Sequence, residues 1–213
     1  MPDFADLRIS ELLSSRLCHE LASPLGAINN GIEMIEEFDD SMLPDALPLI
    51  GSSAKLVASR LTFYRMAYGS AGNQSIASFG DLMDLANAYF EESRTSLSWP
   101  DIPIVPEMPD GAAKLLLNML PLAAETLPRG GLLTVSLDDG AAALTMTVSA
   151  KGVTPRVSEE CGRALSPNAL LDELTPRSIH AYFVTRLALR LSTRIEIDDD
   201  TEDRIVFTVR VSR

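Results

Sequence analysis

The sequence predicts a helical hairpin followed by a two-layer α/β sandwich, and two periodicities support this fold class. Apolar residues recur at helical spacing over residues 6–38 and 42–69, whereas later segments alternate apolar and polar residues as half-buried strands do. A stretch of small residues, GSAGNQS at 69–75, separates the two patterns. We therefore place a helical domain at residues 1–70 and an α/β domain at residues 76–213.

The first predicted helix, residues 6–38, contains a single proline, Pro24. Its apolar residues form one stripe at helical spacing. The stripe comprises Leu13, Leu17, Leu21, Leu25, Ile28, Ile32 and Ile35. Because proline removes a backbone hydrogen bond, we expect a kink in this helix near Pro24.

The second predicted helix, residues 42–69, carries apolar residues at alternating steps of four and three, as a coiled-coil seam does. This seam is Leu43, Leu47, Ile50, Ala54, Val57, Leu61, Tyr64 and Tyr68. The connection FDDSMLP is short enough to make the two helices antiparallel neighbours. Two helices cannot cover two stripes of this width, so we expect a homodimer with a four-helix bundle.

The second domain is predicted to contain helices at 79–94, 111–127 and 177–191. Strands at 132–137 and 143–149 flank Asp138, Asp139 and Gly140, which are typical of a hairpin turn. A second hairpin pairs strands at 193–198 and 205–211. The alternation predicts a sheet with one face covered by helices and the other in water.

Composition excludes several classes of function. The chain has 213 residues, of which 46% are hydrophobic, yet no apolar run approaches the roughly 20 residues of a membrane span. The first residues, MPDFADLRIS, show no basic segment followed by an apolar core, so we expect no secretory signal. The net charge of −12 disfavours nucleic acid as a partner. The two cysteines, Cys18 and Cys161, lie outside any CxxC or metal-ligand spacing, so we expect no bound metal and a reducing, cytoplasmic location.

Two histidines are available for imidazole chemistry, and their surroundings differ. His19 falls opposite the centre of the apolar stripe, on a face with the small or polar residues Ser15, Ala22, Ser23 and Gly26, so a bulky partner can reach it. His180 lies with Val184, Leu187 and Leu191 on the apolar side of its helix and is predicted to be a core or rim residue. Cys18 is predicted to pack nearer the apolar side.

The segment LCHELASPLGAINNGIEMIEE, residues 17–37, resembles the phosphoacceptor helix of two-component histidine kinases. The H-box of these kinases reads histidine, an acidic residue and leucine, then two variable positions, then proline and leucine. The sequence matches it with His19, Glu20 and Leu21, followed after two residues by Pro24 and Leu25. The same stretch is more closely similar to the ChpT-type histidine phosphotransferases, dimeric relatives of kinases that have lost ATP use. The resemblance implies that His19 accepts a phosphoryl group and that Glu20 orients it or accepts its proton.

The second domain then resembles a degenerate kinase ATPase domain. In KLLLNMLPLAAETLPRGG, residues 114–131, Asn118 matches the leading asparagine of the kinase asparagine box, but Leu122 stands where the Mg²⁺-binding one belongs. The segment AKGVTP has no adenine-recognising aspartate, and LSPNALLDELTPRSIHAYF offers no lid glycines for a phosphate cradle. We expect no nucleotide cofactor, and Mg²⁺ is expected from the partner receiver domain.

The resemblance implies a phosphorelay intermediate. Its donor would be the receiver domain of a hybrid, CckA-like histidine kinase, and its acceptors would be response regulators such as CtrA-like and CpdR-like proteins. We expect receivers to dock at Ser15, Ala22, Ser23 and Gly26, because small side chains admit another domain closely. Two alternatives stay open: a divergent but active histidine kinase, and a non-catalytic dimeric scaffold in which His19 is incidental.

Overall fold

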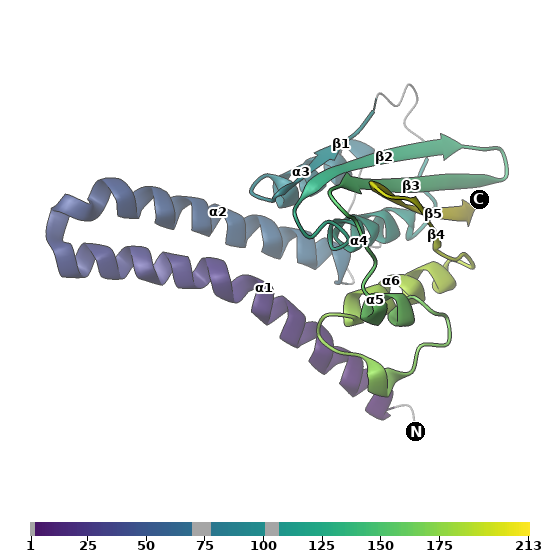
Figure 1. Cartoon of the computed structure of the whole chain (residues 1–213), viewed down its shortest axis with the longest axis horizontal. Helices are drawn as coiled ribbons and strands as arrows, with labels where there is room; N and C mark the ends of the chain where they lie inside the picture. Colours follow the sequence, from purple (N-terminus) through teal and green to yellow (C-terminus); the bar gives the residue numbers. More distant parts are fainter. Residues whose placement is uncertain (1–2, 70–77, 101–106) are drawn as a thin grey trace.

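The computed structural model describes residues 3–69, 78–100 and 107–213 (Figure 1). Most of the predicted linker at 69–75 lies outside the described residues. Two long helices project from a mixed α/β body (Figure 1). The first of them begins at the N-terminus beside that body, and its later part forms the projecting arm with the second helix (Figure 1). Among the described residues, no helix is both long and apolar enough to cross a membrane.

The predicted hairpin is confirmed. Helix α1 spans Asp3–Phe38, a 3-10 turn (η1) spans Asp39–Met42, and α2 spans Leu43–Ala67. The two helices pack antiparallel along the projecting arm (Figure 1). Pro24 lies inside α1, which bends along its length (Figure 1), in keeping with a proline that removes one backbone hydrogen bond.

The α/β body contains a five-stranded sheet with the order β1-β2-β3-β5-β4. Both predicted hairpins are present, as β2 (Gly131–Asp139) with β3 (Ala143–Gly152) and β4 (Glu196–Thr201) with β5 (Arg204–Ser212). Strand β1 (Thr95–Ser98) was not predicted, and it pairs parallel to β2 at the sheet edge. Its four residues are too few to show a clear alternation.

The predicted helices of the body correspond to α3 (Phe79–Phe90), α4 (Ala112–Ala124) and α6 (Ile179–Arg190). Two further elements were not predicted, α5 (Glu159–Ala164) and the 3-10 turn η3 (Leu171–Glu173). Both elements are a single turn or two long, which is too short for an apolar stripe to develop.

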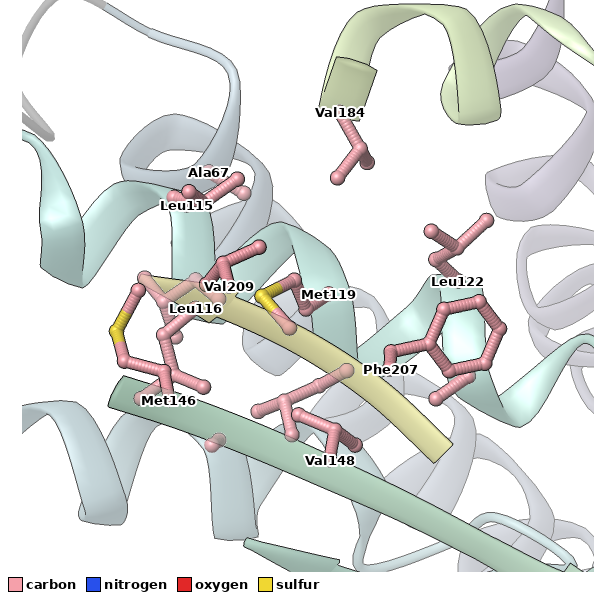
Figure 2. Close-up of a cluster of buried hydrophobic side chains, with 14 of the residues drawn as sticks. Ala67, Leu115, Leu116, Met119, Leu122, Met146, Val148, Val184, Phe207 and Val209 are labelled. Atoms are coloured by element: carbon pink, nitrogen blue, oxygen red, sulfur yellow. The ribbon is translucent and has the colours of Figure 1, made fainter. Parts of the chain in front are cut away.

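The core lies between α4 and one face of the sheet. Buried side chains alternate with half-exposed ones along β3 and β5, so one face of the sheet is covered and the other is wet, as predicted. Met146, Val148, Phe207 and Val209 lie on this face, toward the side chains of α4 (Figure 2). Full burial of each such side chain stabilises the fold by about 1.5–3 kcal/mol.

The hairpin and the α/β body share this core. The end of α2 packs against α3 and α4, with Phe63 and Ala67 fully buried, and the N-terminal half of α1 contacts α6 and η3. Asn118 of α4 donates from its amide to the Ala67 carbonyl at 2.8 Å, and Lys114 donates to the Gly69 carbonyl at 2.8 Å. The phosphoacceptor-like helix therefore lies directly against the second domain.

Candidate functional site

His19 is exposed on α1, as predicted. Three of the four residues expected around it, Ser15, Ala22 and Ser23, are also exposed. Gly26 is half-buried, and a Cβ added there would meet no atom within 4 Å. The side of α1 that carries His19 is therefore open, and its neighbouring side chains are small.

Cys18 is exposed, so the prediction that it packs nearer the apolar side is wrong. The buried arc of this part of α1 includes Leu12 and Leu13 together with Arg16, because it faces the second domain as well as α2. The leucine stripe alone predicted a different centre. Cys18 falls on the opposite side of the helix from this arc.

Glu20 is half-buried and turns toward the interior of the hairpin. The Tyr64 hydroxyl donates to its carboxylate, and Arg16 Nε lies 3.0 Å from its Oε1 in an ion pair one helical turn apart. The guanidinium of Arg60 donates to the Glu20 backbone carbonyl. Burial, with Tyr89 and Glu20 nearby, raises the pKa of Tyr64 well above its usual range, so Tyr64 remains a neutral donor.

Arg16 connects the hairpin to the second domain. Its guanidinium pairs with Glu20 on α1 and with Glu125 just past the end of α4, although its side chain is only 12% exposed. Burial by itself would lower the pKa of Arg16, but the charges of Glu125 and Glu20 outweigh burial and raise it. Arg16 is therefore a permanent cation held between two carboxylates.

Glu125 extends the network to His180. The two side chains approach at 3.3 Å through Nδ1 of His180, which is fully buried, as predicted for a core histidine. Burial lowers the pKa of His180, and an Nδ1–H tautomer of the neutral ring would donate to Glu125. Burial opposes ionisation of Glu125, but His180 and Arg16 lower the pKa of Glu125 below its usual value.

A pocket of about 680 Å³ lies between His19 and the second domain. On α1 it is bounded by Ser15, Arg16, His19 and Glu20, and across from them by Glu160, Thr175, Pro176 and Arg177. Sequence reasoning missed this second wall and Arg16. The spacing of four between Arg16 and Glu20 could have indicated their ion pair. No local pattern indicates Glu125 or Arg177, which reach the site through the tertiary fold.

The two residues of α4 that the sequence resemblance matched to a kinase asparagine box, Asn118 and Leu122, are both buried. Asn118 is fully buried, with its amide engaged by the Ala67 and Lys114 carbonyls at 2.8 Å each. Leu122, at the position of the metal-binding asparagine, is only 2% exposed and lies in the core beside Phe207 (Figure 2). A leucine side chain offers no oxygen or nitrogen to a metal ion.

An exposed histidine on a two-helix hairpin that packs against a five-stranded α/β body is the arrangement expected of a histidine phosphotransfer protein. Residues 79–203 match the family described as the histidine phosphotransferase C-terminal domain. The chain is 35% identical to the protein phosphotransferase ChpT of Brucella abortus (strain 2308) over 203 residues, 95% of each protein. It also superposes on a solved structure of a bacterial phosphotransferase with a TM-score of 0.81 and 34% identity, covering 95% of this chain and 96% of the other.

The chain therefore belongs to the ChpT-type histidine phosphotransferase family.

Proposed function

We propose that the chain is an intermediate of a phosphorelay in which His19 accepts a phosphoryl group from a receiver-domain aspartate and passes it to the receivers of response regulators. One observation carries the assignment to His19. The chain has two histidines, and His19 is exposed within the H-box sequence whereas His180 is fully buried and engaged with Glu125. Only His19 can reach a phosphoryl group on another protein.

The proposed reaction needs a neutral imidazole nitrogen as nucleophile. That nitrogen supplies the electron pair of a new P–N bond, and the P–O bond to the donor aspartate breaks. The aspartate leaves as a carboxylate. In the second half the carboxylate of the acceptor aspartate attacks the same phosphorus and the imidazole leaves. Mg²⁺ held by the receiver would neutralise the phosphoryl oxygens in both steps.

Glu20 acts in this proposal as a positioning residue. Its carboxylate is occupied by Arg16 and Tyr64, and its backbone carbonyl by Arg60, so its contacts fix the turn of α1 that carries His19. A role as proton acceptor would require the carboxylate to leave these partners. The geometry favours the orienting role over the proton-accepting one.

Two observations support operation without ATP. Leu122 replaces a metal ligand and is buried in the core, and the segment before α6 has no glycine from residue 163 to residue 178. A phosphate cradle needs backbone N–H groups that glycine makes accessible. No nucleotide cofactor is therefore expected, and phosphorylation would come from another protein.

The exposed apolar residues of the hairpin support a homodimer. Leu25 and Ile32 on α1, and Leu47 and Leu61 on α2, are between 43% and 57% exposed in the single chain. Leu25 and Ile32 are seven residues apart, and Leu47 and Leu61 are fourteen apart, so each pair lies on one side of its helix. A second copy packed on this side would complete a four-helix bundle and bury all four side chains.

For partners we propose the receiver domain of a CckA-like hybrid histidine kinase as donor, and CtrA-like and CpdR-like response regulators as acceptors. Docking would use the open face formed by Ser15, Ala22, Ser23 and Gly26. These regulators act inside the cell, and the two free cysteines, Cys18 and Cys161, suit a reducing cytoplasm.

The test mixes the purified full chain with a receiver domain carrying a ³²P-labelled aspartyl phosphate, in Mg²⁺ and without ATP. We expect label on the wild type and on Cys18→Ala, an exposed neighbour on α1, but not on His19→Ala. Label that persists on His19→Ala would refute the assignment of His19. A wild type that labels itself from Mg-ATP alone would be an active kinase, and a chain that accepts label from no donor would be a scaffold.

A further inference from the structure

The pocket beside His19 is built by both domains. His19 and Ser15 contribute from α1, while Pro176 and Arg177 contribute from the turn that precedes α6. With a volume of about 680 Å³ it can hold a phosphoryl group together with several water molecules. The second domain is thus placed to act on the phosphoryl group that His19 would carry.

The charges in this pocket are not all compensated. Arg16 is paired with Glu20 and Glu125, and the Glu160 carboxylate accepts a hydrogen bond from the Thr175 hydroxyl. Across the described ranges, the guanidinium of Arg177 makes no hydrogen bond or ion pair. Arg177 is therefore the one cation lining this pocket, within the described part of the chain, that has no anionic partner.

The backbone of Arg177 is held in place although its side chain is free. Its N–H donates to the Thr175 hydroxyl at 3.2 Å, and the Thr175 N–H donates to the Ser178 hydroxyl at 3.0 Å. Its carbonyl accepts from Arg16 Nη1 at 3.5 Å, across the boundary between the domains. The side chain therefore starts from a fixed point beside α1, which lowers the entropy cost of binding an anion.

We propose that Arg177 of the second domain binds the phosphoryl group attached to His19. The inference rests on the proposed function, because it needs His19 as the phosphoacceptor. A guanidinium can donate two parallel hydrogen bonds to phosphoryl oxygens, and it remains charged at every physiological pH. In a chain of net charge −12, a phosphoryl dianion on His19 needs such a local cation. This contact gives the degenerate domain a part in the transfer itself.

The experiment uses a phosphodonor that has no protein surface. Phosphoramidate is a small anion whose P–N bond breaks as the imidazole nitrogen attacks phosphorus and ammonia leaves, so it reports on the site without receiver docking. The variants are Arg177→Ala, Arg177→Lys and His19→Ala. The matched control is Arg194→Ala, which removes an exposed arginine of the same domain that does not line the pocket.

We expect Arg177→Ala to lower the rate of labelling by about tenfold, the loss of one charge-assisted contact in a water-exposed site, with Arg177→Lys in between. Arg194→Ala should react at the wild-type rate. The ³¹P resonance of the phosphohistidine should also titrate at higher pH in Arg177→Ala, because a neighbouring cation favours the dianion. A purely structural role for Arg177 would not move that midpoint.

The outcomes separate this inference from the proposed function. If Arg177→Ala is labelled at the wild-type rate with an unchanged ³¹P midpoint, while His19→Ala takes no label, Arg177 does not bind the phosphoryl group and the role of His19 stands. If Arg177→Ala is impaired only with a phosphorylated receiver as donor, Arg177 contacts the receiver surface and the inference is wrong. If neither donor labels the wild type, the proposed function itself fails.

Discussion

Replacing Glu125 by glutamine tests whether the second domain holds the phosphoacceptor helix through Arg16. Glu125 is 30% exposed and bridges Arg16, which is 12% exposed, to the fully buried His180. Glu125→Gln keeps the size of the side chain but removes its charge, so Arg16 loses one of its two carboxylate partners. The guanidinium remains buried with Glu20 at 3.0 Å as its compensation.

The expected cost follows from how buried these groups are. Removing one partner of a fully buried ion pair costs about 3–5 kcal/mol, whereas an exposed pair contributes roughly 0–1 kcal/mol. Because Arg16 keeps Glu20 and Glu125 is partly in water, we expect a loss of about 2 kcal/mol in the free energy of unfolding. For a chain of this size that corresponds to a Tm lower by roughly 4–8 °C.

The assay is urea and thermal unfolding followed by circular dichroism, with Glu159→Gln as the matched control. Glu159 forms an ion pair with Arg163 in which both side chains are exposed, so its loss should change the free energy by no more than about 0.5 kcal/mol. Equal effects of Glu125→Gln and Glu159→Gln would show that the buried network does not stabilise the contact between the domains. If the two variants are equally stable, a change in the phosphoryl transfer rate of folded Glu125→Gln would reflect the transfer reaction and not a loss of stability.

Three further predictions concern docking, pH and assembly. Ala22→Trp and Gly26→Trp should block transfer from a receiver while the Tm stays near that of the wild type, because both positions face open space; normal transfer rates would contradict the docking face. The free energy of unfolding should fall as pH drops below about 6.5, because burial lowers the pKa of His180 and the unfolded chain therefore takes up this proton at higher pH than the folded chain. Urea titrations of His180→Gln should show a weaker dependence on pH. Leu47→Glu with Leu61→Glu should convert a dimer into monomers in sedimentation, since both leucines are exposed on one side of α2; an unchanged mass would place the dimer contact elsewhere.

The hairpin and the exposed histidine could be predicted because they depend on local periodicity. Long helices with regular apolar stripes leave little choice about which side chains face water, so His19 could be placed from helical geometry. The two β-hairpins followed from alternation around turn residues. Strand β1 could not be found in this way, because only its pairing with β2, more than 30 residues away, makes it a strand.

The wrong placement of Cys18 has the same origin as the missed half of the site. The apolar stripe from Leu13 to Ile35 takes no account of the second domain, which adds Arg16 and Glu20 to the buried arc. The arc is thereby centred near Glu20, from which His19 is about 100° away around the helix and Cys18 about 160°. His19 therefore lies at the edge of the interface and Cys18 lies in open solvent.

This position at the edge would let the α/β domain contact a phosphoryl group on His19, as we propose, although Leu122 offers no metal ligand. A histidine at the centre of the interface between α1 and the second domain would be out of reach of a receiver. A histidine on the opposite side of α1 would have no contact with the second domain. At the edge, the imidazole stays open to a receiver, while the Arg16–Glu125–His180 network and the turn at Arg177 lie against its flank. This network ties α1 to the second domain, and under the proposal it would help to set where a phosphoryl group on His19 stands relative to the guanidinium of Arg177.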